Sequence, residues 1–335
     1  NSGGPHCLKY GVTLNHVLAA TIVLPDGEIV ELGDRDGEMS GYDLLGAFVG
    51  SEGCFGVALD VTVRLTRKPA AVRTARADFM TVAEAARATS AIIASGVVPA
   101  ALEFMDSGTI RVVEASIFAA GYPVDAAAIL LIEVDGTIES ADAEMDIARK
   151  LCADCGARSV RVAVDDAERG RLWQGRKKAF GAMGRLAPNL AVQDAVIPRT
   201  KLTEVLAQIH AIADASGVTV CNVFHAGDGN LHPNISYNAS DPVQARRVHD
   251  AMGAMMQVCV DAGGSITGEH GVGLDKLQYM PMLFDGPTLA AMCDLRGAFD
   301  PNRRANPGKV VPVHSCREWL AAPSVRSASE QTDAR

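Results

Sequence analysis

Two histidines flank a glycine-rich turn in the segment FHAGDGNLHPN, residues 224–234. The apolar runs on both sides, 218–224 and 231–237, are typical of the two strands of a hairpin, so His225 and His232 should lie close together. Neutral imidazole is the commonest protein ligand of zinc-like ions, and two from one hairpin supply half of a metal site. A plain turn with two polar histidines is the alternative. The segment does not fit a phosphate-binding loop, because it lacks GxxxxGK[ST] and no helix follows the glycines.

A second segment, GGSITGEHGVG at residues 263–273, places Glu269 and His270 side by side between glycines. Adjacent side chains point in different directions, so one can bind a metal while the other faces a cavity beside it. The spacing is not HExxH, which disfavours a zinc protease. Alone, the segment is more typical of a charged turn. Together with His225 and His232, Glu269 supplies the third ligand of a catalytic metal that keeps one position open.

The segment RLWQGRKKAF, residues 171–180, carries four cations, which on one helix usually form a solvated face. Arg176 is the exception that we consider. A planar guanidinium grips a carboxylate through two parallel hydrogen bonds, and an acidic substrate needs such a grip.

Glycines in the first 60 residues are more frequent than turns require, and they suit a backbone that passes close to an extended ligand such as a dinucleotide. No GxGxxG lies in a βαβ setting, so a Rossmann NAD site is not supported. The glycines concerned are Gly3, Gly4, Gly11, Gly50, Gly53 and Gly56.

The composition of the 335 residues limits the classes of function. Lys and Arg number 31 against 40 Asp and Glu, a net charge of −9, which argues against binding to nucleic acid or to an anionic membrane surface. No apolar run approaches the ~18 residues of a membrane span.

Cys152 and Cys155 form a CxxC without the second pair of a structural zinc site, so we expect reduced thiols late in a helix. The chain starts at Asn1 without a secretory leader, and we expect it to be a fragment of a longer protein.

The elements that must position these residues form an α+β pattern. A hairpin is expected over 17–32 around the turn Pro25-Asp26-Gly27, then a short helix over 42–50 and a strand over 57–65, with a boundary near residue 70. After it, strands alternate with amphipathic helices, and we expect a sheet with helices on one face. The predicted strands are 100–105, 126–135, 158–164 and 190–197, and the predicted helices are 82–94, 140–153, 166–180, 201–215, 249–262 and 286–299.

Five segments in fixed order resemble FAD-linked 2-hydroxyacid oxidases of the vanillyl-alcohol-oxidase-like flavoproteins. They are NSGGPHCLKYG, GYDLLGAFVGSEGCFGV, FHAGDGNLHPN, GGSITGEHGVGLDK and AFDPNRRANPGKV. Within that family the chain is most similar to the FAD-binding subunit of glycolate oxidases, beside D-lactate and D-2-hydroxyglutarate dehydrogenases. The resemblance covers nearly all of residues 1–313.

The resemblance implies a division of the chain into parts. Residues 1–70 are expected to be the later part of a PCMH-type FAD-binding domain, whose N-terminal part with the pyrophosphate-binding glycine loop is missing. Residues 71–285 are expected to form an α+β cap domain that holds the substrate on an antiparallel sheet. A helical segment, 286–313, is expected to return to the flavin. Residues 314–335 are polar and small, and we expect a disordered tail.

The resemblance also implies roles for single residues. A divalent metal (Zn, Mn or Fe) is expected on His225, His232 and Glu269, with His270 as the general base. Arg176 is expected to bind the substrate carboxylate, and Asn234 to bind substrate beside the metal hairpin. The residues expected at the FAD are Asn1, Gly3, Gly4, Tyr10, Gly11, Glu52, Gly53, Gly56 and Asn306.

The activity that the resemblance implies is oxidation of a small 2-hydroxy acid to the 2-oxo acid with hydride transfer to FAD. Glycolate is favoured as the substrate over D-lactate and D-2-hydroxyglutarate. The chain has no four-cysteine run for an iron–sulfur cluster, so electrons are expected to leave to a partner subunit such as an iron–sulfur protein. The protein is expected to be cytoplasmic and to associate with the membrane only through that partner, without inserting into the bilayer itself. Two alternatives remain open: a flavin-free zinc hydrolase on the same ligands, and an inactive fragment or pseudo-subunit.

Overall fold

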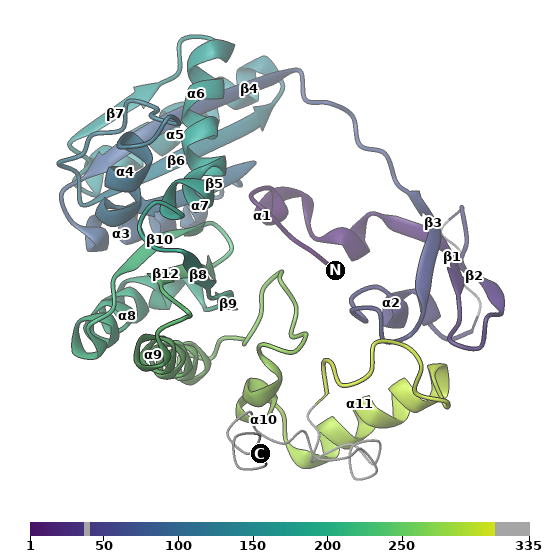
Figure 1. Ribbon diagram of the computed structural model, residues 1–335. Helices are drawn as coiled ribbons and strands as arrows, with labels where there is room; N and C mark the ends of the chain where they lie inside the picture. Colours follow the sequence, from purple (N-terminus) through teal and green to yellow (C-terminus); the bar gives the residue numbers. More distant parts are fainter. Residues whose placement is uncertain (37–40, 312–335) are drawn as a thin grey trace. The chain divides into compact units, whose positions relative to one another are not determined.

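The computed structural model describes residues 1–36 and 41–311 (Figure 1). The chain forms two compact units. The larger unit consists of Asn1–Val17 and Val63–Gly271, and the smaller unit consists of Leu18–Thr62 and the described residues from Val272 onward. The predicted division at 70 and 285 therefore differs from the packing, because the first 17 residues pack with the larger unit. The roles assigned to those segments stay predictions, and the predicted tail, 314–335, lies outside the described residues.

The smaller unit contains the predicted hairpin. Strands β1 (Val17–Val23) and β2 (Ile29–Gly33) pair antiparallel, and β3 (Val57–Val63) completes the sheet order β2-β1-β3. Gly27 has a φ of +98°, which a side chain would strain. The predicted hairpin turn is confirmed.

Helices complete the smaller unit. They are α2 (Leu44–Phe48), α10 (Met280–Leu283) and α11 (Gly286–Phe299), and the predicted short helix and the helix at 286–299 are confirmed. Phe55 stacks on Phe299 with ring centroids 4.5 Å apart. The buried Arg296 donates hydrogen bonds to the carbonyls of Lys309, Ala305 and Asn306, which ties the last described segment to α11.

An antiparallel sheet forms the centre of the larger unit. Its strand order is β7-β4-β6-β5-β10-β11-β9, and β12 pairs with β10 and β8. The strands are β4 (Ala71–Phe79), β5 (Ala101–Asp106), β6 (Ala128–Gly136), β7 (Ser159–Val162), β8 (Asn189–Val192), β9 (Ala195–Val196), β10 (Val220–His225), β11 (Asn230–Leu231) and β12 (Pro233–Tyr237). The predicted strands are confirmed, except that those at 190–197 and 231–237 are each broken into two short strands. The breaks, at residues 193–194 and at His232, both lie at the candidate site described below.

The predicted helices of the larger unit are present, together with two that were not predicted, Cys7–Tyr10 and Ser107–Glu114. The helices of this unit are α1 (Cys7–Tyr10), α3 (Val82–Ala94), α4 (Ser107–Glu114), α5 (Ile138–Asp154), α6 (Asp166–Lys177), α7 (Ala179–Met183), α8 (Leu202–Ser216) and α9 (Pro242–Asp261). The predicted start of the helix at residue 249 is wrong. The helix begins at Pro242, because Asp241 caps its first turn and proline fits that position. In residues 1–36 and 41–311 no helix is long and apolar enough to cross a bilayer.

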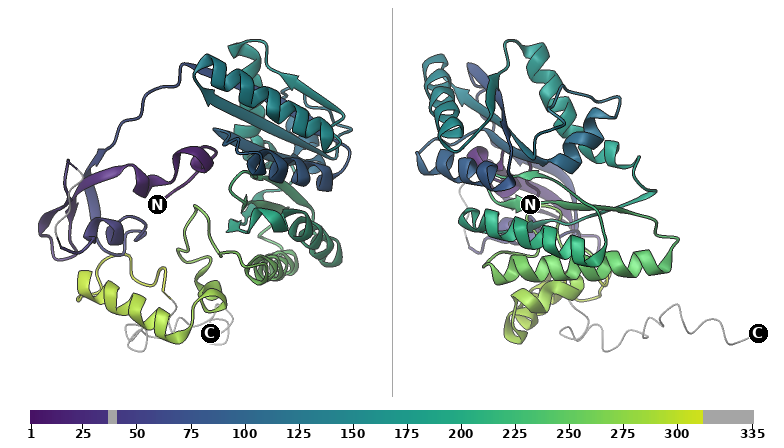
Figure 2. Two further views of the ribbon diagram at one scale, coloured as in Figure 1. Left: turned by 180° about the vertical axis from the view of Figure 1, so that it is seen from behind. Right: turned by 90° about the vertical axis from the view of Figure 1, so that its left-hand side faces the viewer.

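Helices cover both faces of this sheet, so the expectation of helices on one face is wrong (Figures 1 and 2). Successive residues of a strand point to opposite faces, and in β6 every residue from Ala128 to Asp135 is buried. Helices α4, α6 and α7 share one apolar cluster with Ile129 and Leu131, while α3 and α5 contact β4 and β6. The apolar run AILLI, residues 128–132, is typical of a strand that is covered on both sides.

Candidate metal centre

The hairpin of β10 and β11 brings the two histidines together, as predicted. His225 is the last residue of β10 and pairs with Asn230, and His232 lies between β11 and β12. Their ring centroids are 5.2 Å apart. Gly229 has a φ of +79°, and a Cβ there would lie 2.2 Å from the carbonyl oxygen of Ile197, so the turn requires glycine.

The carboxylate of Glu269 faces both histidines. Its Oε1 lies 3.2 Å from Nε2 of His225 and 3.2 Å from Nε2 of His232. Ligands about 2.1 Å from a tetrahedral metal are separated from one another by about 3.4 Å, so both distances from Oε1 match those between ligands of one ion. We call His225, His232 and Glu269 the metal triad.

The other nitrogen of each imidazole is already engaged. Nδ1 of His225 donates to the carboxylate of Glu103 at 2.7 Å and 2.9 Å, and Nδ1 of His232 donates to the carbonyl of Gln193 at 3.3 Å. With their hydrogens on Nδ1, the neutral rings direct two Nε2 lone pairs and a carboxylate oxygen at one point. Such a point suits a cation, and oriented Nδ1–H groups are typical of metal-binding histidines. The residues therefore fit a divalent metal.

The electrostatics of the protein without metal agree with this geometry. Burial alone would lower the pKa of His225, but the carboxylate of Glu103 raises that pKa to about 9. Burial alone would raise the pKa of Glu269, but hydrogen bonds from His225 and His232 hold it well below its usual range. A proton on an imidazole thus supplies the positive charge that a metal ion would supply.

Glu103, which the sequence analysis did not identify, connects this site to Arg176. The Glu103 side chain is 0% exposed, and its Oε2 lies 2.6 Å from Nη2 of Arg176. Burial would raise the pKa of Glu103, but Arg176 and His225 lower it. Arg176 is buried and does not belong to a solvated face, unlike Arg171 and the two lysines of this segment. Within the described residues its buried Nε has no hydrogen-bond partner.

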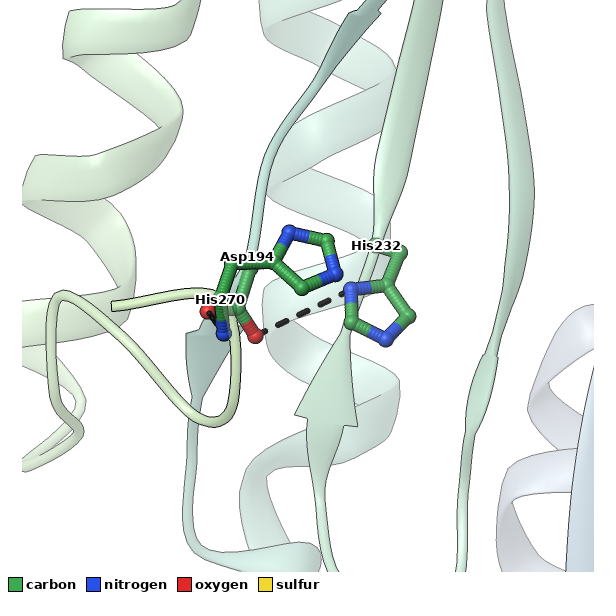
Figure 3. Close-up of side chains that lie close together, drawn as sticks. All are labelled: Asp194, His232 and His270. Carbon is green, nitrogen blue, oxygen red and sulfur yellow. Dashed lines mark hydrogen bonds and ion pairs between the residues drawn. The ribbon is translucent and has the colours of Figure 1, made fainter. Parts of the chain in front are cut away.

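His270 and Asn234 both adjoin the metal triad. The ring of His270 stacks on that of His232 with centroids 5.0 Å apart, and its Nε2 lies 3.8 Å from Oε1 of Glu269 (Figure 3). Its side chain is 43% exposed, in contrast to the buried triad histidines. Asn234 donates hydrogen bonds to the carbonyls of Cys221 and His232, and its buried Oδ1 has no partner among the described residues. The roles of His270 as base and of Asn234 and Arg176 in substrate binding stay predictions.

The residues predicted at the FAD fall into the two units. In the larger unit, Gly3 lies against Glu269, because a Cβ on Gly3 would be 3.0 Å from Glu269 Oε2. Gly4 faces open space, and the hydroxyl of Tyr10 donates to Asp135. Asn1 accepts a hydrogen bond from the Leu14 amide, and Gly11 has a φ of +82°.

In the smaller unit, Glu52, Gly53 and Asn306 lie together. All three have positive φ, at 53°, 75° and 41°, and Asn306 donates to the carbonyl of Glu52 at 2.7 Å. The Glu52 carboxylate accepts the amides of Val272 and Gly273. Gly56 packs its backbone on β1, where a Cβ would meet the Val23 carbonyl at 2.5 Å. Left-handed backbone clusters of this kind are typical of close approach to a ligand. FAD binding by these residues stays a prediction.

Asp194 is the other residue that the sequence analysis missed. It is fully buried beside the metal triad and accepts hydrogen bonds from the backbone that carries Glu269 and His270. Glu103 and Asp194 share one sequence signal, since each is an acid inside an apolar strand region, AALEF and NLAVQDAV. A buried carboxylate requires partners, so such positions mark polar sites.

Residues 68–310 match the family described as FAD linked oxidases, C-terminal domain. The chain is 43% identical over 322 residues to the glycolate oxidase subunit GlcD of Escherichia coli, covering 96% of this chain and 64% of that protein. It is 38% identical to GlcD of Bacillus subtilis, covering 96% and 68%, and 30% identical to a mitochondrial D-lactate dehydrogenase of Arabidopsis thaliana, covering 93% and 55%. The chain thus spans only part of the length of these relatives.

Solved structures share the fold. p-Cresol methylhydroxylase matches with a TM-score of 0.70 at 13% identity, covering 92% of this chain and 69% of that chain. The 4-ethylphenol oxidase of Gulosibacter chungangensis matches with a TM-score of 0.68 at 14% identity, with the same shares covered. The predicted family resemblance and the predicted α+β fold class are both confirmed.

Proposed function

Because the chain belongs to the FAD-linked oxidases, we propose that the protein oxidises a small 2-hydroxy acid to the 2-oxo acid with FAD as the cofactor. The observation that carries the proposal is the metal triad with His270 beside it, in a chain of this family. Relatives that match almost the whole chain are described as a glycolate oxidase subunit and a D-lactate dehydrogenase, and both names refer to 2-hydroxy acids. We favour glycolate as the substrate and place D-lactate and D-2-hydroxyglutarate second.

The metal triad would hold a divalent ion, with zinc, manganese and iron all compatible with two imidazoles and a carboxylate. Bound there, the ion would act as a Lewis acid that lowers the pKa of the substrate hydroxyl. The carboxylate and hydroxyl oxygens of a 2-hydroxy acid are adjacent, so one substrate can present both to this site.

His270 takes the hydroxyl proton on its Nε2. This atom lies 3.8 Å from Glu269 Oε1, next to the point that the triad atoms share. The exposed side of its ring gives the proton a route to solvent. A positioned histidine base is worth roughly 10²–10⁴-fold in rate.

Arg176 and Asn234 orient the substrate. The buried Nε of Arg176 and the buried Oδ1 of Asn234 have no partner within the described residues, so each has capacity for a substrate atom. Arg176 would hold the carboxylate and thereby direct the α-carbon. FAD supplies the hydride acceptor when bound. Its proposed contacts are the glycine-rich segment at 1–11 and the cluster of Glu52, Gly53, Gly56 and Asn306.

Electrons would leave to a partner, for which we propose an iron–sulfur subunit that holds the protein at the cytoplasmic face of the membrane. This part of the proposal rests on the family and on GlcD being described as a subunit.

Anaerobic reduction of the flavin in the complete protein tests the function. Glycolate, D-lactate and D-2-hydroxyglutarate are mixed separately with the metal-loaded protein, and the visible absorbance of oxidised flavin is followed. We expect glycolate to bleach the flavin and to yield glyoxylate, one for each flavin. A protein that carries no flavin and cleaves esters or amides would instead be a zinc hydrolase. A folded protein with neither flavin nor turnover would be a pseudo-subunit, and either result overturns the proposal.

A further inference from the structure

Asp194 lies between the two segments that supply the metal triad. Its side chain is 0% exposed, in the break between β8 and β9. Figure 3 shows it beside His232 and His270. A fully buried carboxylate is costly unless several donors satisfy it, so its partners indicate what it holds in place.

The partners of Asp194 come mainly from the loop of residues 267–271, which we call the GEHG loop. Oδ2 accepts hydrogen bonds from Thr267 Oγ1 at 2.8 Å and from the backbone amides of Gly268, Glu269 and His270 at 3.0, 3.2 and 3.0 Å. Three consecutive amides thus converge on one carboxylate oxygen. Hydrogen bonds to an ionised acceptor are about twice as strong as neutral ones.

The second oxygen of Asp194 holds the histidine hairpin. Oδ1 accepts a hydrogen bond from Nδ2 of Asn230 at 2.6 Å. Asn230 pairs with His225 in the hairpin, and its side chain is packed so closely on Gly268 that a Cβ there would lie 2.1 Å from Nδ2. One buried carboxylate therefore joins the strand pair that carries both histidines to the loop that carries Glu269.

We propose that Asp194 is the positioning residue of the metal centre, which fixes the carboxylate of Glu269 and the ring of His270 against the histidine hairpin. The GEHG loop has no regular secondary structure, and its amides at 268–270 all donate to Asp194. Without that acceptor, Glu269 would lose its fixed direction toward His225 and His232, and the site would lose its preorganised third ligand.

A direct role of Asp194 as a metal ligand is the competing interpretation, since Asp194, His232 and His270 also lie within ligand distance of one another. The hydrogen bonds argue against it. Both oxygens of Asp194 already accept N–H or O–H donors, and Nδ1 of His232 is 3.8 Å from Oδ1 and bonded to the Gln193 carbonyl. A cation among those donors would be repelled. This role of Asp194 rests on the proposed metal centre, but in it Asp194 positions the GEHG loop and does not bind the ion.

Zinc affinity of the 335-residue chain, measured by competition with a chromophoric chelator, tests the proposal. We expect Asp194→Asn to weaken zinc binding by roughly 10–100-fold, as for other residues that support metal ligands. The matched control is Asp106→Asn. Asp106 is also buried and accepts two backbone amides, from Thr109 and Asn222, but contacts no member of the metal triad. The control should lower stability without changing zinc affinity.

Amide hydrogen exchange supplies a readout that does not depend on metal. Residues 268–270 should be protected in the unaltered chain and exchange faster in Asp194→Asn, with or without zinc. If the unaltered chain shows this protection but binds no zinc, the proposed function fails while the loop role of Asp194 stands.

If Asp194→Asn does not fold, the zinc affinity of Thr267→Val tests the positioning role of Asp194 instead. This substitution removes one donor to Asp194 and keeps the side-chain shape, and we expect a smaller loss of zinc affinity in a folded protein. Unchanged zinc affinity in a folded Asp194→Asn, or in Thr267→Val when Asp194→Asn is unfolded, would overturn the proposal. Loss of a second bound zinc per chain in Asp194→Asn would make Asp194 a ligand and also overturn it.

Discussion

Replacing Glu103 by glutamine should weaken both the stability of the protein and its affinity for metal. The Glu103 carboxylate lies between Nη2 of Arg176 and Nδ1 of His225 and is completely buried. Glutamine has the same shape and can still accept the His225 hydrogen. It removes the negative charge that neutralises Arg176 and that raises the pKa of His225 to about 9.

The expected size of the effect follows from this burial. Removing one partner of a buried ion pair costs about 3–5 kcal/mol, because the remaining charge is left uncompensated. That is a large part of the roughly 5–15 kcal/mol by which a domain is stable. Losing the carboxylate behind a metal-binding histidine typically weakens metal binding by roughly 10–100-fold. Glu103→Gln should therefore lower both the free energy of unfolding and the zinc affinity.

Glu133→Gln is the matched control. Glu133 is also a buried acid on the neighbouring strand β6, and it is also paired with an arginine of α6, Arg169, at 2.9 Å. It further accepts hydrogen bonds from Thr74 and Trp173 but contacts no member of the metal triad. Chemical unfolding and chelator competition on both variants should show that both lose stability and that only Glu103→Gln loses zinc affinity. Equal zinc affinities in the two variants would refute the reasoning.

Three further predictions concern the same centre. His270→Gln should lower kcat by ~10²-fold or more while bound zinc is unchanged, because we propose His270 as the base and not as a ligand; a normal kcat would remove it from that role. In the metal-free protein the pKa of His225 is about 9, so this ring is protonated at neutral pH and zinc must displace the proton. Zinc affinity should then rise up to ~tenfold per pH unit below that value, and calorimetry in two buffers should detect proton release; a flat profile would contradict this. Gly3→Ala would put a Cβ 3.0 Å from Glu269 Oε2 and should weaken zinc binding roughly tenfold, whereas Gly286→Ala, with no atom within 4 Å, should not. Equal effects of the two alanines would show that Gly3 has no contact with the site.

Local patterns predicted most of the elements and the proximity of His225 and His232. The spacing of His225 and His232 around a glycine turn fixes two ring nitrogens on one hairpin, whatever the rest of the fold does. Local sequence could not identify Glu269 as the third ligand, because it does not show which loop faces that hairpin. That prediction depended on the resemblance to a known family. The sequence also did not predict that two of the expected strands are interrupted beside the site. These interruptions, at His232 and Asp194, depend on tertiary contacts.

Glu103 and Asp194 show where sequence reasoning stops. Each is visible as an acid in an apolar strand, but its partner lies far along the chain: Glu103 pairs with Arg176, and Asp194 with residues 267–270. The pairing of each acid with its hydrogen-bond donors depends on the order and register of the strands. Strand order and register depend in turn on the packing of the whole sheet. The helices on both faces, by contrast, could have been predicted from five consecutive apolar residues of β6, Ala128 to Ile132.

X-ray diffraction from crystals of the zinc-loaded chain, recorded on both sides of the zinc absorption edge, tests the metal centre most directly. The geometry predicts one strong anomalous peak within about 2.0–2.2 Å of Nε2 of His225, Nε2 of His232 and a carboxylate oxygen of Glu269. A peak only at Cys152 and Cys155, or a fully loaded chain with no peak at the metal triad, would contradict it.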